Sequence, residues 1–170
     1  GSGTTGIIPG SELTPWEGNS EGLITLTTPS MTYENYEFWG EVRPKAPGIV
    51  FKNCAFRGKN PSTLTNLNGL IKCYGKDFYH FVLIDCTLDP LPWVTQRGVA
   101  SLSPYSAGIH GGDFEMYRCE VTNVQDGINY VAHEGWDAGT TAEDRWCLVE
   151  GSWIHKMYYQ NNWYGPSNGR

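Results

Sequence analysis

The chain has 170 residues and a net charge of −6, and its lysine and arginine residues are scattered along the sequence. This length suits one domain with a sizeable core. Nucleic acid is not expected as a partner, because its phosphates require clustered basic side chains. A membrane is not expected either, because no apolar segment approaches the roughly 20 residues that cross a bilayer.

The first 22 residues, with their prolines and a tryptophan, are expected to form a lead-in that covers the N-terminal end of a single domain over residues 23–170. The exposed strand edges and apolar interior at the end of a repeating β-structure require such a cover.

An eight-residue pattern then recurs five times. Its sixth position steps by 18, 32, 33 and 33 residues, and such periods are typical of a solenoid. The segments are "MTYENYEF" (31–38), "IVFKNCAF" (49–56), "FVLIDCTL" (81–88), "FEMYRCEV" (114–121) and "CLVEGSWI" (147–154).

The fifth position of each unit predicts a sharp bend. Most of the residues found there (Asn35, Asn53, Asp85, Arg118 and Gly151) tolerate a left-handed backbone. Each unit therefore becomes two short strands, in which alternate residues point inward. The inward residues are expected to be Ile49, Phe51, Cys54, Phe56, Phe81, Leu83, Cys86, Leu88, Phe114, Met116, Cys119, Val121, Cys147, Val149, Ser152 and Ile154.

A third strand is expected to close each coil, at "GLIKCY" (69–74), "GIHGG" (108–112) and "GINYV" (127–131). With Leu70, Ile109 and Ile128 pointing inward, the outward row becomes Ile71, His110 and Asn129. Three short strands per turn predict an all-β fold, a right-handed parallel β-helix of about five coils. A β-sandwich is the alternative, but antiparallel strands give no reason for the pattern to return in phase.

Five cysteines are present and no two are spaced as in a zinc ribbon or a redox motif. The odd count also fits poorly with a disulfide framework. We expect Cys54, Cys86 and Cys119 to be reduced and stacked on one another as small apolar residues of the interior.

Loops inserted between the strands are the first candidates for binding. The segments 57–68, 89–107 and 132–144 exceed what a bare coil needs, and loops on a rigid scaffold commonly carry function. Aromatic rings beside polar groups suit sugars, whose C–H faces stack on the rings. The expected binding residues there are Trp93, Tyr105, His133 and Trp136, with inward packing of the rings as the alternative.

The outward row of the third strand is the second candidate. His110 and Asn129 lie in it, and Asp113 and Asp126 flank it in sequence. A histidine near carboxylates is suited to acid–base catalysis, although a plain surface hydrogen-bond network is the alternative. No metal site and no cofactor are expected: the histidines lack ligand spacing, and two neighbouring carboxylates such as Asp113 and Glu115 are a weak calcium signal.

Two long runs resemble a known family. The run from "TGIIPGSELTPWEG" to "PGIVFKNCAFRG" resembles the opening of pectate-lyase-like parallel β-helix proteins of actinobacteria and their phages. The run "SAGIHGGDFEMYRCEVTNVQDGINYV" is similar to a pattern in minor tail proteins of those phages.

The resemblance implies a virion component, a minor tail protein or tailspike, that binds host cell-surface polysaccharide and contacts other tail proteins. It also implies that a homotrimer is one arrangement to test, and an extracellular protein is the alternative location. The first alternative function is a polysaccharide lyase or glycoside hydrolase on the same scaffold, with Asp113 and Asp126 as its carboxylates. A lyase of this family is expected to use an Arg or Lys, whereas Arg97 and Arg118 fall in a loop and a turn. The second alternative is a purely structural tail component.

The last segment, 155–170, stops where earlier units supply a third strand. We therefore expect the helix to be incomplete at this end. Tyr158, Tyr159 and Trp163, or a partner chain, would then cover the terminal coil.

Overall fold

The computed structural model describes residues 5–18, 21–63, 69–73, 75, 78–102, 107–130 and 146–157. Almost every regular element in them is a strand. The exceptions are one four-residue helix, α1 (Pro92–Thr95), and one 3-10 turn (Pro61–Thr63). Among these residues no helix has the length and apolar character needed to span a membrane.

The strands form three sheets in which every pairing is parallel. Sheet A contains β1 (Thr14–Pro15), β4 (Tyr36–Phe38), β7 (Ala55–Phe56), β10 (Thr87–Leu88), β13 (Glu120–Thr122) and β16 (Trp153–His155). Sheet B contains β2 (Leu23–Leu26), β5 (Glu41–Pro44), β8 (Gly69–Cys73), β11 (Ala107–Gly111) and β14 (Asp126–Tyr130). Sheet C contains β3 (Thr32–Glu34), β6 (Ile49–Lys52), β9 (Phe81–Ile84), β12 (Phe114–Tyr117) and β15 (Cys147–Glu150).

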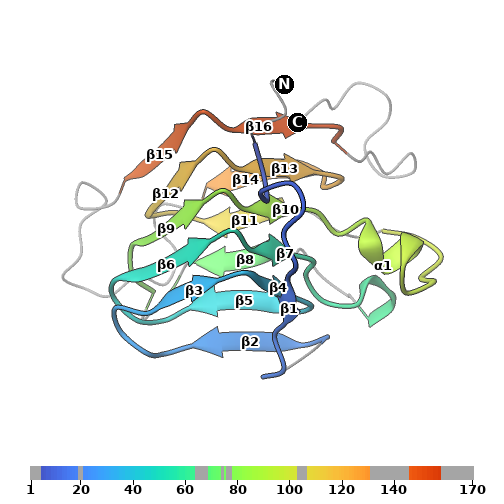
Figure 1. Cartoon of the computed structure of the whole chain (residues 1–170), viewed down its shortest axis with the longest axis horizontal. Coiled ribbons are helices and arrows are strands. Elements are labelled where there is room, and N and C mark those ends of the chain that lie inside the picture. Colours follow the sequence, from blue (N-terminus) through green and yellow to red (C-terminus); the bar gives the residue numbers. More distant parts are fainter. Residues whose placement is uncertain are drawn as a thin grey trace.

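From β2 onward the chain visits the sheets in the fixed order B, C, A, and it does so in five successive circuits. Each circuit lies beside the previous one, so that the strands rise in sequence order from β2 to β16 (Figure 1). The chain is therefore all-β with three parallel sheets. This architecture is compatible with a parallel β-helix.

The bend expected at the fifth position of each unit is present. Asn35, Asn53, Asp85, Arg118 and Gly151 all have positive φ, between 50° and 61°. This left-handed step ends the strand in sheet C and starts the strand in sheet A. The prediction of two short strands per unit is confirmed at every unit.

The interior is a set of apolar columns that run across the circuits. One of them aligns Phe51, Leu83 and Met116, and another aligns Phe56, Leu88 and Val121. All six side chains are buried in one continuous core. Close-packed contacts of this kind account for most of the stability that such a short domain can gain.

The register of the third strand corrects one expectation. Ile71, not Leu70, aligns with Ile109 and Ile128, and Lys72 aligns with His110 and Asn129. Both Leu70 and Ile71 are apolar and fully buried, so hydropathy alone did not distinguish the two registers. The expected outward row is therefore wrong at Ile71, which belongs to the core.

The cysteine column is confirmed. Cys54, Cys86 and Cys119 are free thiols, all buried, and each directly precedes one of three neighbouring strands of sheet A. The backbone N–H of Cys86 donates to Sγ of Cys119 at 3.4 Å. Burial raises the pKa of the Cys86 thiol well above its ordinary value, so it stays protonated in the interior.

The N-terminal segment, residues 5–18, crosses the circuits along the corner between sheets C and A (Figure 1). The N–H of Gly6 donates to the carbonyl of Arg118, and the N–H of Ile8 donates to Oδ1 of Asn53 at 2.7 Å. Further along, Thr14 donates to the carbonyl of Asn35, where β1 pairs with β4. We call residues 5–11 the strap.

At the other end, β14, β15 and β16 are edge strands. Cys147, Val149 and Ile154 occupy inward positions by register, as expected, yet all three are exposed. The expectation that they are buried is therefore wrong for the described residues, because an edge strand has a neighbour on only one side. The residues proposed as a cover, Tyr158, Tyr159 and Trp163, lie outside the described part of the chain.

Candidate functional site

The loop residue Trp93 is not at the surface, contrary to expectation. It lies in α1, its side chain is 1% exposed, and its indole N–H donates to the carbonyl of Gly58 at 3.0 Å. Its ring meets that of Trp39 edge to face, 5.0 Å between centroids, and the guanidinium of Arg97 lies 3.7 Å above the Trp39 ring. Trp93 therefore anchors its loop to the side of the sheets. This is the alternative given above, in which the ring packs inward instead of forming a binding surface.

Three other expected binding residues, Tyr105, His133 and Trp136, lie outside the described residues, so their assignment stays a prediction. His110 and Asn129 do lie side by side in register on β11 and β14. However, His110 is only 9% exposed, which removes it from the open surface where we expected it.

Asp113 and Asp126 lie toward opposite ends of β11. Asp126 aligns with Ala107, the first residue of β11. Asp113 lies two residues beyond Gly111, the last residue of that strand. Four residues of strand separate these two ends by about 13 Å. Paired carboxylates of glycoside hydrolases lie at most about 9.5 Å apart, so the backbone register does not favour this pair, which stays a prediction.

The structure instead gathers five side chains on the outer face of sheet C. His80 is bound on both sides, with Nδ1 2.6 Å from Oδ1 of Asp113 and Nε2 2.9 Å from Oε2 of Glu115. The hydroxyl of Tyr117 donates to Oε1 of Glu115 at 2.6 Å. The ring of Trp146 lies against the imidazole, with 4.4 Å between centroids. We call these five residues the His80 cluster.

Strand register explains why these residues meet. Phe81, Phe114 and Cys147 are aligned on β9, β12 and β15, so the residues just before them, His80, Asp113 and Trp146, are aligned as well. Glu115 and Tyr117 follow Asp113 at alternate positions, so they point to the same outer face. The positive φ of Asp113, 69°, turns the chain from sheet B into sheet C at this point.

The electrostatics of the cluster favour an ionised Glu115. The hydrogen bond from Tyr117, together with His80, lowers the pKa of the Glu115 carboxyl. The same bond raises the pKa of the Tyr117 hydroxyl, because losing its proton would place two negative charges together. Glu115 is thus a fixed hydrogen-bond acceptor with a defined orientation.

Exposed aromatic rings border the cluster. Trp146 is 49% exposed although it contacts His80, and Tyr79 and Tyr130 are also exposed. The Tyr130 ring covers Gly112, where an added Cβ would lie 2.7 Å from Cε2 of the ring. Flat rings beside oriented carboxylates form a surface on which a sugar can stack and hydrogen-bond.

A smaller group of the same composition occurs on sheet A. The rings of Trp153 and His155 are stacked at 3.6 Å between centroids, and Nε2 of His155 lies 2.7 Å from Oε1 of Glu120. This group has one carboxylate, whereas the His80 cluster has two. The strap also lies against Glu120, because a Cβ added at Gly6 would lie 3.1 Å from its Oε2. The His80 cluster is therefore the better candidate.

Of the five residues in the cluster, the sequence had singled out Asp113 as a site residue and Glu115 only as part of a weak calcium signal. The signal was present one position upstream of the eight-residue units, where His80, Asp113 and Trp146 align in three consecutive repeats. In the described part of the chain, no group of three or more His, Cys, Asp and Glu side chains is arranged to hold a metal ion.

Comparison of the chain with protein-family models, with curated proteins and with solved structures found no match.

Proposed function

We propose that the chain is a right-handed parallel β-helix whose His80 cluster binds polysaccharide. The fixed strand order through sheets B, C and A supports the helix, because each sheet receives one strand per circuit. The hand follows from the general rule that parallel strands of one sheet are joined by right-handed crossovers.

The observation that carries the binding proposal is the exposed ring of Trp146 beside two carboxylates held by His80. A pyranose can stack on the ring while its hydroxyls donate to Glu115, and the buried Asp113 holds His80 in place. Glu115 is pre-oriented by His80 and Tyr117, so little side-chain entropy is lost on binding.

Binding is favoured over glycoside hydrolysis at this site. A general acid in such enzymes needs a raised pKa, so that it carries its proton near neutral pH. The pKa of Glu115 moves the other way, because Tyr117 and His80 stabilise its charged form. Hydrolysis and lyase activity remain the alternatives that the experiment below must separate from binding.

For the biological setting, we propose a minor tail protein or tailspike of a phage, with host cell-surface polysaccharide as the ligand. The support is the resemblance of the runs within residues 5–58 and 106–131 to those proteins. Other tail proteins are then its partners, and the virion is its location.

The experiment is a glycan array, together with pull-down on purified cell-wall polysaccharide, using the intact chain, Trp146→Ala and Trp153→Ala. Trp153 is the matched control, because it is an exposed tryptophan that contacts a histidine on another sheet. Trp146→Ala loses the ring on which the sugar stacks, so it should bind about tenfold more weakly. Trp153→Ala should bind normally.

Equal loss in both variants, or in neither, would contradict the assignment to the His80 cluster. New reducing ends or unsaturated products in the same samples would show that the chain cleaves the polysaccharide, and catalysis would then replace binding as the proposed function. An intact chain that binds no glycan would favour a purely structural role.

A further inference from the structure

A second surface lies at the opposite end of the molecule from the His80 cluster, where β1 pairs with β4. It is a hollow of about 310 Å³. Its lining residues are Thr14, Pro15, Trp16, Glu17, Gly18 and Tyr36. This size is at the lower limit of small-molecule sites, which suits a compact group better than an oligosaccharide.

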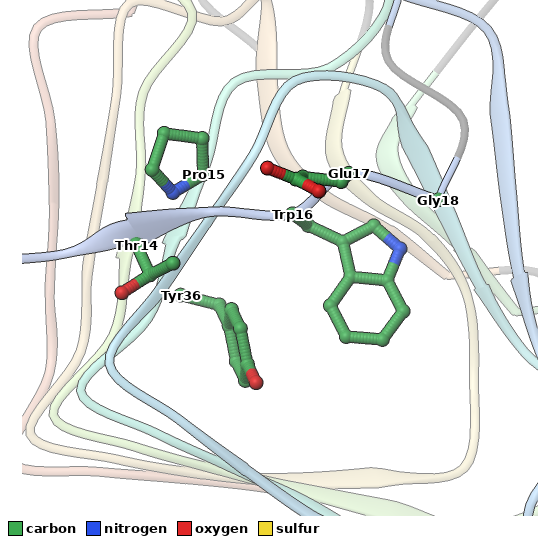
Figure 2. A pocket seen from close by; sticks show the side chains of 6 residues that line it. All are labelled: Thr14, Pro15, Trp16, Glu17, Gly18 and Tyr36. Carbon is green, nitrogen blue, oxygen red and sulfur yellow. The ribbon is translucent and has the colours of Figure 1, made fainter.

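Two aromatic rings form its walls. Trp16 and Tyr36 meet nearly at a right angle, 83°, with 5.2 Å between their centroids. Figure 2 shows both rings extending to one side of the chain, whereas the Glu17 carboxylate lies with Pro15 on the other side. The ring of Trp16 is fixed from behind by edge-to-face contact with Tyr33 and by contact with Phe38.

The chemistry of this lining is selective. Ring faces carry negative electrostatic potential and attract cations, and aromatic walls are the usual means of recognising quaternary ammonium groups. Glu17 adds a carboxylate, and none of the six lining residues is basic. Hydrogen-bonding side chains are few, only Thr14, Glu17 and the Trp16 and Tyr36 polar tips, whereas a sugar requires several oriented partners.

We propose that this hollow, walled by Trp16 and Tyr36 with Glu17 at its border, binds a trimethylammonium group such as that of choline. The alkyl groups contact the two rings, and the positive charge is attracted by the ring faces and by the Glu17 carboxylate. This site is separate from the His80 cluster and does not depend on the polysaccharide proposal.

The test compares choline with its neutral isostere, 3,3-dimethyl-1-butanol, by following the tryptophan indole N–H signals in NMR spectra of the intact chain. The Trp16 signal is assigned from its absence in Trp16→Phe. Choline should shift that signal in a saturable way. It should bind about 5- to 30-fold more tightly than the isostere, the range that a cation–π contribution supplies.

Two variants test the geometry while keeping Trp16 itself. In Gly18→Ala the new Cβ lies directly against Nε1 of Trp16, so the ring must move and choline binding should fall at least about tenfold. In Glu17→Gln the affinity should fall less, about 2- to 5-fold, because this carboxylate is exposed to solvent. Trp153→Phe is the matched control, because this tryptophan is exposed and lies outside both proposed sites, and it should bind choline normally.

Sedimentation with phosphatidylcholine vesicles forms a second arm. If the intact chain co-sediments with the vesicles and Gly18→Ala does not, the bound trimethylammonium belongs to a lipid headgroup. If the intact chain does not co-sediment, the trimethylammonium belongs to a soluble or polymer-borne ligand. The proposal is overturned if the folded chain shows no saturable shift with choline. It is overturned equally if the isostere binds as tightly as choline, or if Gly18→Ala leaves the affinity unchanged.

Discussion

At the scale of single residues, the His80 cluster couples stability to pH through Glu115. Tyr117 and His80 hold the pKa of the Glu115 carboxyl below its ordinary value in the folded chain. In the unfolded chain both contacts are lost, and the carboxyl returns to about 4.3. The stabilisation is therefore complete above that pH and is lost as the pH falls through the lower, folded pKa.

We predict that Glu115→Gln is less stable than the original chain at pH 7 and that this difference in unfolding free energy shrinks as the pH falls below about 4. Urea unfolding at a series of pH values measures it. Glu34→Gln, an exposed carboxylate on β3 of the same sheet, controls for the loss of one negative charge. A difference that stays constant down to pH 3 would show that the contacts to Glu115 do not stabilise its charge.

At the scale of elements, the strap is tied to the circuits by Asn53. Oδ1 accepts from the N–H of Ile8 at 2.7 Å, and Nδ2 donates to Ser11 at 2.9 Å and to Asn35 at 2.7 Å. The same residue makes the left-handed bend, with φ of 51°. One asparagine thus fixes both a corner of the sheets and the segment that crosses it.

We predict that Asn53→Ala lowers the unfolding free energy by about 3 kcal/mol, from lost hydrogen bonds and a left-handed alanine. Asn53→Gly, which keeps the bend, should cost about 1 kcal/mol less. In both variants the Ile8 amide should exchange with solvent faster. Asp85→Ala alters the equivalent corner one circuit later and should leave that exchange unchanged. If Ile8 exchanges at its original rate in Asn53→Ala, the strap is held by other contacts.

At the scale of the whole molecule, the two ends of the columns differ. Near β2 and β3 the inward residues Ile24, Leu26 and Tyr33 are buried, and Trp16 packs against the core beside them. Near β15 and β16 the inward residues Val149 and Ile154 are exposed. Apolar surface at an edge of paired strands is the part of such an architecture that contributes least to stability.

A matched pair of valines tests this difference. Val121 is fully buried on β13, whereas Val149 on β15 is 42% exposed. Val121→Ala should lower the unfolding free energy by about 2 kcal/mol, from lost burial and a residual cavity. Val149→Ala should lower it by less than about 1 kcal/mol. Equal costs would mean that Val149 is covered in solution.

Much of the local architecture could be predicted from the sequence. The left-handed bends follow from Asn35, Asn53, Asp85 and Gly151, because few other residue types tolerate that backbone. The paired strands follow from alternating hydropathy, and the column of Cys54, Cys86 and Cys119 follows from units that return in phase. These features depend on short segments, so a repeated pattern is enough to specify them.

The tertiary structure decided what depends on contacts between distant segments. Leu70 and Ile71 are equally apolar and both lie in the core, so only pairing with β11 and β5 set which one aligns with Ile109 and Val42. Trp93 suits a binding surface as well as an anchor, until packing on Trp39 buries it. His80 meets Asp113 and Glu115 across 33 and 35 residues, because β9 and β12 lie side by side in exact register. Hydropathy and local backbone preference act within a strand or a turn, whereas register and loop packing are settled only when the whole core assembles.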